Sequence, residues 1–362
     1  MTVKNIFYWK DVKEAASLLK QGELVCFPTE TVYGIGAIAT SQRAFDKLVE
    51  AKRRPPTKPF TLMCSSLGQA AEYCQIDVRS LSVMKAYMPG EITVLVPARK
   101  NLPSWITLGT PLIGIRVPDS PEVLDLIEQV GAPLLVPSAN KSGEKTATCF
   151  EEAFSAFKDE AYIIKGECRS HLASTIVKME PGIGISLVRE GPIPFAEIQK
   201  TYEEASMNVS LACDHGAFDL KSAIRLHLQG MGINVLDEGT DSKVSCDYPI
   251  FAIKAAKDVA EKRAELGVVC CTSGEGVCIA ANKVKGIRCG IGYTDDCSAK
   301  LREHNNANVI SFGAKYMKEE DVLRRVDIFL LSKFSPLEKH HRRVAEIEEF
   351  ESRQGEKDDS SL

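Results

Sequence analysis

The chain has 362 residues, of which 44% are apolar and 26% charged, and its formal net charge at pH 7 is −4. This length accommodates two ordinary domains, and the composition is typical of a globular chain rather than a disordered one. The small negative charge argues against non-specific nucleic-acid binding, and no apolar run approaches the roughly 20 residues of a membrane helix, so we expect a cytoplasmic protein with no membrane partner.

Cysteine and histidine usage limits the chemistry that the chain can build. The 12 cysteines form no CxxC pair with zinc-finger spacing, so we expect free, mostly buried thiols in a reducing compartment and no metal site made of protein ligands. Of the 6 histidines, only His171 precedes residue 207. Acid–base chemistry near neutral pH is therefore easier to build in the second half.

The first half places apolar, β-branched segments between helical patterns in an irregular order. Residues 13–36 predict a helix, a turn, a strand and a glycine-punctuated loop, and residues 41–54 predict a helix that ends before the prolines of PPTKP. Further strands are expected at EITVLVP (91–97), LIGIRVP (112–118), PLLVPSAN (133–140) and STIVKM (174–179). We expect an α/β fold with a twisted mixed sheet and flanking helices.

From Met207 onward, strands and helices alternate strictly. Helices are expected over residues 217–231 and 248–266, and five strands over 209–213, 233–239, 267–271, 287–293 and 308–313. Strands separated by helices pair in parallel with right-handed crossovers, which predicts a doubly wound, Rossmann-like five-stranded sheet. Ligands bind beyond the carboxyl ends of such strands.

A polar run before Met207 gives way to an apolar strand, which indicates that two folds are joined near residues 202–207. We therefore predict one domain over residues 1–206 and a second over residues 207–350. The polar residues 351–362 are expected to form a disordered tail.

The first half offers cations and small hydroxyl groups but no Ser/His/Asp or Cys/His apparatus. Its segments FPTETVYGIGA, AKRRPPTKPF, MPGEITVLVP, IGIRVP, VPSANKSG, ASTIV and LVREG together resemble the YrdC family of threonylcarbamoyl-AMP synthases. The resemblance implies that L-threonine, bicarbonate and ATP give threonylcarbamoyl-AMP and pyrophosphate, for threonylcarbamoyladenosine modification of tRNA. Magnesium is expected beside ATP, and tRNA or tRNA-modifying proteins are further partners.

Residue roles in this half follow from the resemblance. Lys52 and Arg54 match the family's Lys-x-Arg signature, and Ser138 and Asn140 match its Ser-x-Asn signature. The residues expected to bind ATP are these four together with Lys58, Ser142 and Arg189. Threonine is expected to contact Thr31, Arg116 and Ser174, and Met63 stands where some relatives have a threonine-contacting histidine. Some YrdC-like proteins are thought to bind RNA without catalysis, so an RNA-binding module is the alternative.

In the second half, VVCCTSGEGVCIAANK runs from a strand through a glycine-containing turn into a helix. Gly274 and Gly276 allow a turn whose N–H groups point inward, and such a turn before a helix receives an anion and favours a thiolate. An ordinary strand-to-helix turn with buried cysteines explains this spacing equally well.

Five blocks in order, ACDHGAFDLK, DYP, CTSGEGVCIAANK, HNNANVISFG and KHHRRVAEI, resemble the ribose-5-phosphate isomerase B family. The resemblance implies cofactor-free interconversion of ribose 5-phosphate and ribulose 5-phosphate through an enediolate. Cys271 would be the base, His304 would assist ring opening, and Ser273 completes the catalytic set, whereas Cys270 belongs to the core. The remaining expected sugar-phosphate contacts are Asp214, His215, Thr272, Gly274, Glu275, Gly276, Asn305, Lys315, Lys339, His340 and Arg343.

Three positions depart from the family pattern. Thr272 stands where glycine is common, and Lys315 and Lys339 replace arginines, keeping the charge but losing bidentate geometry. Six-carbon sugar phosphates therefore stay open as substrates, and an oligomerisation module without catalysis is a further alternative. We expect a homodimer or tetramer through this half, because residues 339–343 would meet the phosphate of a neighbouring subunit, as in the family's dimers.

Overall fold

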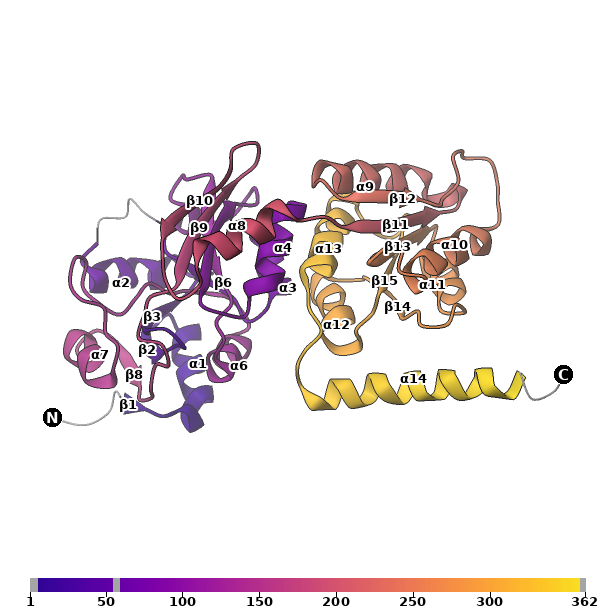
Figure 1. Ribbon diagram of the computed structural model, residues 1–362. Coiled ribbons are helices and arrows are strands. Elements are labelled where there is room, and N and C mark those ends of the chain that lie inside the picture. Colours follow the sequence, from indigo (N-terminus) through magenta and orange to yellow (C-terminus); the bar gives the residue numbers. More distant parts are fainter. Residues whose placement is uncertain (1–5, 55–58, 359–362) are drawn as a thin grey trace. The chain divides into compact units, whose positions relative to one another are not determined.

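The computed structural model describes residues 6–54 and 59–358, which separate into two compact units (Figure 1). One unit comprises Met1–Ile76 and Ser82–Glu204, and the other comprises Asp77–Leu81 and Ala205–Leu362. Each unit has its own sheet. Within the described ranges, no helix is both long enough and apolar enough to cross a membrane.

The N-terminal unit has the predicted mixed sheet. Within the described residues it has ten strands in the order β1-β8-β2-β3-β7-β4-β6-β5-β9-β10, with both parallel and antiparallel neighbours. The strands are β1 Ile6–Phe7, β2 Val25–Pro28, β3 Tyr33–Ile38, β4 Leu62–Met63, β5 Ile92–Pro97, β6 Leu112–Arg116, β7 Leu134–Leu135, β8 Tyr162–Ile164, β9 Thr175–Glu180 and β10 Gly184–Arg189.

Helices flank this sheet (Figure 1): α1 Val12–Lys20, α2 Gln42–Lys52, α3 Leu67–Ala71, α4 Val78–Tyr87, α5 Ser104–Thr107, α6 Pro121–Val130, α7 Phe150–Phe157 and α8 Phe195–Glu203, with a 3-10 turn at Trp9–Asp11. The local sequence explains α2, which leads into the cation-rich segment. The Ser41 hydroxyl accepts the Ala44 N–H at its start, and Phe45 and Leu48 are buried. Arg53 adopts a left-handed backbone (φ 49°) that ends the helix.

Two predictions for this unit were wrong. The expected glycine-punctuated loop is strand β3, because Gly34 and Gly36 pack tightly in the sheet, and a Cβ at Gly34 would lie 2.5 Å from Val136 Cγ1. The expected strand at residues 133–140 is only the two-residue β7. Beyond it the chain stays beside β3 without forming a regular strand: Ser138 makes an isolated bridge with Gly34, and the Ala139 N–H donates to the Tyr33 carbonyl at 2.7 Å.

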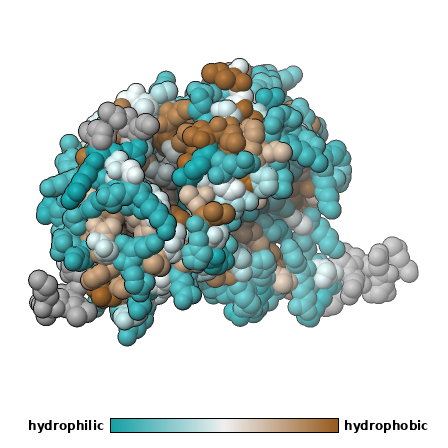
Figure 2. Space-filling model, turned by 60° about the vertical axis from the view of Figure 1, so that its left-hand side comes forward, coloured by the Kyte–Doolittle hydropathy of each residue, from teal (hydrophilic) through white to brown (hydrophobic). Residues whose placement is uncertain are grey.

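Exposed apolar side chains occur on the face of the molecule shown in Figure 2. Independently of that view, the exposed large apolar side chains of the β9–β10 hairpin are Ile183, Leu187 and Val188. β10 is the last strand of the sheet, so its outer edge has no neighbouring strand among the described residues.

The C-terminal unit has the predicted doubly wound parallel sheet. Its strands are β11 Asn208–Cys213, β12 Asn234–Asp237, β13 Leu266–Cys271, β14 Cys289–Ile291 and β15 Val309–Gly313, in the order β12-β11-β13-β15-β14, and every pairing is parallel. All six residues of the central β13 are buried, as expected for a parallel strand covered on both faces.

Its helices are α9 Phe218–Gly230, α10 Tyr248–Ala260, α11 Glu275–Ala281, α12 Asp295–Asn305, α13 Glu319–Leu331 and α14 Glu338–Asp358, with a 3-10 turn at His215–Ala217. α10 and α11 pack together on one side of the sheet, and α9, α13 and α12 form the other layer (Figure 1).

Two predictions for this unit were also wrong. The helix expected over 248–266 ends at Ala260, because Lys262 adopts a left-handed backbone (φ 61°). The tail expected to be disordered from residue 351 is helical as far as Asp358, since α14 continues through it. The Glu351 carboxylate accepts the Gly286 N–H at 2.9 and 3.0 Å, which anchors this part of the helix. Residues 359–362 of the expected tail lie outside the described residues.

Candidate active sites

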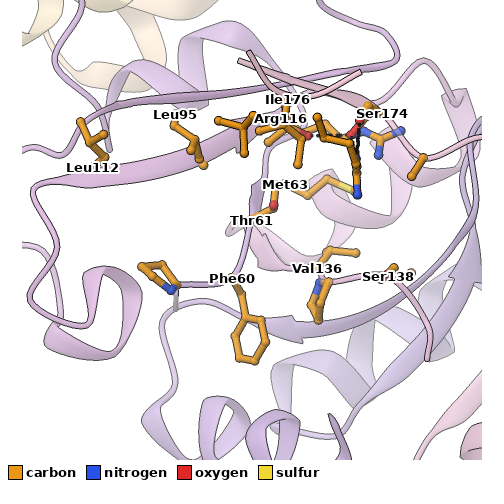
Figure 3. Close-up of a pocket in the computed structure, with 18 of the residues that line it drawn as sticks. Phe60, Thr61, Met63, Leu95, Leu112, Arg116, Val136, Ser138, Ser174 and Ile176 are labelled. Atoms are coloured by element: carbon orange, nitrogen blue, oxygen red, sulfur yellow. Dashed lines mark hydrogen bonds between the residues drawn. The ribbon is translucent and has the colours of Figure 1, made fainter. Parts of the chain in front are cut away.

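The N-terminal unit contains a cavity of about 630 Å³ whose two ends differ in chemistry. Figure 3 shows Arg116 and Ser174 toward one end and Leu95 and Leu112 toward the other. Alternate residues of β5 and β6 face it, because side chains of a strand alternate between the two sides of a sheet. On β6 these are Leu112, Gly114 and Arg116.

Arg116 is oriented by the turn between β2 and β3. The residue is 6% exposed, and its Nη2 donates to Glu30 Oε1 at 2.8 Å and to Thr31 Oγ1 at 2.7 Å. The Thr29 and Thr31 hydroxyls lie 2.9 Å apart and stiffen this turn. Arg116 Nε is buried without a partner, so the guanidinium has unused donor capacity beside the cavity.

A second cation lies at the polar end. The Arg189 guanidinium donates to the Ser174 carbonyl at 2.8 and 3.1 Å, and the Ser174 hydroxyl lies 2.9 Å from that of Thr93. Partial burial lowers the pKa of Arg189, and the positive charge of Arg116 lowers it further. An anion bound here would offset both effects.

Lys52 of the Lys-x-Arg signature contacts the loop that carries the Ser-x-Asn signature, but not every residue of the two signatures lines the cavity. Lys52 is 3% exposed and donates from Nζ to the carbonyls of Ser138 at 2.6 Å and Asn140 at 2.5 Å, and burial lowers its pKa to about 8. The Ser138 hydroxyl donates to Asn140 Oδ1 at 2.6 Å. Lys52 therefore lies behind the loop that it supports, whereas Ser138 borders the cavity.

The predicted residues of this half divide into three groups. Arg54, Ser138, Arg189, Arg116 and Ser174 line the cavity. Of the described predicted residues, Lys52, Asn140, Ser142 and Thr31 do not line it and lie behind or beside its wall. Lys58 falls outside the described residues.

Sequence reasoning missed the apolar wall of the cavity. Phe60, Leu95, Leu112, Val136 and Ile176 line it (Figure 3), and the Arg54 guanidinium lies 5.2 Å from the Phe60 ring centroid. The alternation of apolar residues within 91–97 and 112–116 was the available signal, but it does not say which face carries a ligand.

In the C-terminal unit, Cys271 ends β13 and faces α10 and α11. It is 5% exposed, and its Sγ accepts the Gly274 N–H at 3.1 Å. Gly274 adopts a left-handed backbone (φ 84°), and a Cβ there would lie 2.8 Å from the carbonyl carbon of Phe312, so glycine is required. Cys270 is fully buried, and burial raises its pKa well above the usual range.

The loops after β11 and β13 meet at the carboxyl edge of the sheet. Asp214 Oδ1 accepts the Gly216 N–H at 3.0 Å, and a Cβ on Gly216 would lie 2.2 Å from Thr272 Oγ1. The Cys246 N–H donates to His215 Nδ1 at 3.2 Å, which leaves Nε2 to carry the proton of the neutral ring. The Lys315 N–H donates to the Thr272 carbonyl at 3.0 Å and brings a cation to the same edge.

A cavity of about 470 Å³ opens beside this edge. Ser273 and Glu275 of the turn line it, with Tyr293, Tyr316, Lys318 and Arg325. One residue of the predicted catalytic set, Ser273, and one predicted contact residue, Glu275, therefore border an open cavity.

The second predicted cluster lies at the opposite edge of the same sheet. His304 is near the end of α12, and its ring stacks on that of His340 with centroids 4.2 Å apart. Burial lowers the pKa of both histidines, and nearby lysines, among them Lys339, lower it further. Arg343 adds positive charge beside His340.

One chain does not bring this cluster to Cys271. β15 begins after His304 and Asn305, and it pairs Val309 with Gly267 at one end and Gly313 with Cys271 at the other. These four strand steps span about 13 Å. The expectation that His304 works beside Cys271 is therefore not met within a single chain.

Comparison with known proteins identifies relatives for each unit. The family model named for Sua5, YciO and YrdC, described as telomere recombination, matches residues 17–191. A threonylcarbamoyl-AMP synthase of Pseudoalteromonas translucida is 35% identical over 152 residues, which cover 41% of this chain and 81% of the relative. One from Pyrococcus abyssi is 34% identical over 199 residues, 54% of this chain, but this chain spans only 58% of it.

The model described as ribose/galactose isomerase matches residues 209–347. A ribose-5-phosphate isomerase B of Mycobacterium leprae is 37% identical over 148 residues, which cover 41% of this chain and 91% of the relative. A galactose-6-phosphate isomerase subunit LacB of Clostridium acetobutylicum is 36% identical over 144 residues, which cover 40% of this chain and 83% of the relative.

Among solved structures, a variant of the Pyrococcus abyssi Sua5 protein aligns with a TM-score of 0.52 at 23% identity. The alignment covers 76% of this chain and 95% of that one. This likeness concerns the fold alone.

Proposed function

The chain belongs to the YrdC family in its N-terminal half and to the ribose/galactose isomerase family in its C-terminal half, and we propose that each half catalyses its family's reaction. The N-terminal half would convert L-threonine, bicarbonate and ATP to threonylcarbamoyl-AMP and pyrophosphate. The C-terminal half would interconvert ribose 5-phosphate and ribulose 5-phosphate.

The amphipathic cavity carries the first proposal. Its polar end suits anions, because Arg116 and Arg189 both line it and partial burial lowers the pKa of Arg189. Its apolar wall suits a purine ring, with Phe60 close to Arg54. A ligand with a flat apolar ring at one end and several anionic groups at the other matches both parts, and ATP is such a ligand.

In this reaction the carbamate of threonine attacks the α-phosphorus of ATP, and the bond to the bridging oxygen breaks as pyrophosphate leaves. Both reactants are anions, so the residues must neutralise charge and hold the attacking and leaving oxygens in line. We assign the threonine carboxylate to Arg116 and Ser174, and the phosphates to Arg54, Ser138 and Arg189. Lys52 would act indirectly by holding the Ser138 loop.

Magnesium would be held largely through the nucleotide. Among the described residues that line the cavity, Glu180 is the one carboxylate, and the described part of the chain contains no group of three or more metal-ligating side chains. A metal–phosphate complex with several water ligands fits such a lining. Bound there, the ion would neutralise phosphate charge.

For the isomerase, the contact between the Gly274 N–H and Cys271 Sγ carries the proposal. Cys271 would remove the proton from the carbon beside the carbonyl, and the N–H groups of residues 272–276 would hold the oxygen of the enediolate. Asp214 and His215 Nε2 would bind sugar hydroxyls. The proton then returns to the neighbouring carbon while the hydroxyl proton on the second carbon passes to the oxygen of the first, which completes the aldose–ketose exchange.

We propose that a second copy of the chain completes this site. The stacked His304 and His340, with Lys339 and Arg343, form a positively charged cluster about 13 Å of strand away from Cys271. In a two-fold symmetric dimer each copy can place this cluster against the carboxyl edge of its partner, which creates two equivalent sites. His304 would then open the sugar ring, and Lys339 and Arg343 would bind the phosphate.

The named relatives act on sugar phosphates of different length, so the sugar needs a direct assay. We propose a five-carbon substrate, with six-carbon sugar phosphates as the second candidate. Comparing kcat/KM of the full chain for ribose 5-phosphate and for galactose 6-phosphate decides between them. A clear preference for galactose 6-phosphate would contradict the proposal.

Pyrophosphate release by the full chain tests the first reaction. It should require ATP, threonine and bicarbonate together, and each omission should abolish it. RNA binding without any such release would instead favour the RNA-binding module, and a dimer without isomerase activity would favour an oligomerisation role for the C-terminal unit.

A further inference from the structure

Two half-buried thiols lie against each other at Cys278 of α11 and Cys289 of β14. The Cys278 thiol donates to the Cys289 carbonyl oxygen at 3.4 Å, and both side chains are free and partly exposed. The nearby Cys289 thiol lowers the pKa of Cys278, whereas the nearby Cys278 thiol and burial raise that of Cys289. Neither residue has a role in the proposed isomerase chemistry.

The Asn282 side chain clamps the two cysteines together. Its Nδ2 donates to the Cys278 carbonyl at 3.0 Å and to the Cys289 carbonyl at 2.9 Å, and its Oδ1 accepts the Cys289 N–H at 2.8 Å. One amide therefore ties the end of α11 to the first residue of β14. A bond between the sulfurs would link two residues that this amide already holds together.

Two cysteines on strands near the sugar-phosphate site are less accessible, whereas Cys246, beside His215, is partly exposed as well. Cys270 and Cys213 are fully buried, and burial raises the pKa of each thiol. Cys278 combines partial exposure with a lowered pKa, so an oxidant in water would react there more readily.

We propose that Cys278 and Cys289 form a reversible disulfide that lowers turnover at the neighbouring sugar-phosphate site. With hydrogen peroxide as the oxidant, the Cys278 thiolate attacks one peroxide oxygen, the O–O bond breaks, and a sulfenic acid and hydroxide form. The Cys289 sulfur then attacks the Cys278 sulfur and expels the second oxygen as water. Two thiols and one peroxide thus give one disulfide and two waters.

Short contacts connect this pair to the proposed base. The Cys278 N–H donates to the Gly274 carbonyl at 3.3 Å, and the Gly274 N–H donates to Cys271 Sγ at 3.1 Å. Ser311 Oγ holds the same Gly274 carbonyl from β15. A disulfide needs its sulfurs about 2.05 Å apart. Drawing Cys278 toward β14 would therefore shift the turn that positions Cys271.

Mass spectrometry of the full chain tests the disulfide itself. After brief treatment with hydrogen peroxide and alkylation of the remaining thiols, we expect a linked peptide pair containing Cys278 and Cys289, two hydrogens lighter than the free peptides and separated by dithiothreitol. Cys289→Ser should lose this link, whereas Cys297→Ser, at a partly exposed cysteine on α12, should keep it. Cys278 and Cys289 both recovered as alkylated thiols, or a link at other cysteines, would overturn the proposal.

Isomerase assays test the effect on turnover, which rests on the proposed function. Peroxide should lower kcat/KM of the unmodified chain several-fold, and dithiothreitol should restore it. Since Cys271 is itself oxidisable, Cys289→Ser is the decisive comparison and should keep its activity at the same dose. An equal loss of kcat/KM in Cys289→Ser would show that the disulfide does not lower turnover at the sugar-phosphate site. If the untreated chain shows no isomerase activity, the proposed function fails, while the mass measurement still decides whether the disulfide forms.

Discussion

The N-terminal cavity and the proposed isomerase site differ in how the fold assembles them. Around the cavity, Arg54, Arg116, Ser174 and Arg189 come from four separate segments and border one space within one unit. In the C-terminal unit, Cys271 and His304 lie at opposite edges of one sheet.

Sheet geometry explains this difference. The mixed N-terminal sheet lays alternating residues of neighbouring strands under one cavity. In a parallel sheet all strands end at one edge, whereas the helices between them end at the other edge. Residues that follow strands therefore gather at one edge and residues that end helices gather at the other. In the proposed dimer a second chain joins the two groups.

Replacement of Cys271 by alanine should cause the largest change. We expect isomerase kcat/KM to fall by about 10³-fold, the usual contribution of a general base. Pyrophosphate release should be unaffected, because Arg116 and the other cavity residues belong to a separate unit. Cys270→Ala is the matched control on the same strand and should keep most activity; equal losses in the two variants would refute the assignment of the base.

Mixing two inactive chains should test the two-chain site. Cys271→Ala and His304→Ala variants should each be inactive alone. Dissociated and reassociated together, they should recover about a quarter of wild-type activity, because half of the dimers are mixed and each mixed dimer has one intact site. Recovery should be measured against unmixed samples treated identically. No recovery from stable mixed dimers would show that the site lies within one chain.

Loss of Arg189 should weaken the synthase by a smaller factor. We expect Arg189→Ala to lower kcat/KM for pyrophosphate release by roughly 10- to 100-fold, the effect of losing a charge-assisted contact to phosphate. Arg169→Ala removes an exposed arginine whose partner is Asp119 and which does not line the cavity. This control should retain full activity, and a similar loss in both variants would indicate a general charge effect.

The His304–His340 pair should give the smallest effect, a pH dependence of stability. Burial lowers the pKa of both rings from the ordinary 6.5, so the unfolded chain takes up their protons first as the pH falls. The contribution of the two neutral rings to the free energy of unfolding is present above pH 6.5 and is lost as the pH falls toward the folded-state pKa values. The melting temperature should fall by a few degrees more in the wild type than in His304→Ala between pH 7.5 and 5.5.

Millimolar phosphate should reduce this pH dependence, because an anion stabilises the charged rings. If the melting temperatures of the wild type and of His304→Ala depend on pH in the same way, the histidine pair contributes nothing to the pH dependence of stability. His341→Ala, at the next residue along α14, is a comparison variant and should change the pH profile less than His304→Ala does, because His341 makes only the last of the contributions that lower the pKa of His340.

Sequence patterns predicted the second sheet better than the first. All five strands of the parallel sheet were predicted, because buried apolar runs such as residues 267–271 are bounded by turns. The β3 strand was predicted as a loop, since its glycines are typical of loops and only packing against Val136 and Phe27 explains them. The helical continuation of α14 depends on contacts with Gly286 and Arg288, which are far away in sequence.

The sequence by itself determined the two families and the types of chemical group available, because motifs such as Ser138-x-Asn140 and the turn after Cys271 are local. Only the tertiary structure decided which of those groups face a shared space. It placed Lys52 behind the cavity wall, His304 at the far edge of its sheet, and Cys278 against Cys289. The physical reason is that a side chain's surroundings depend on strand alternation and on packing between distant segments, neither of which a local motif encodes.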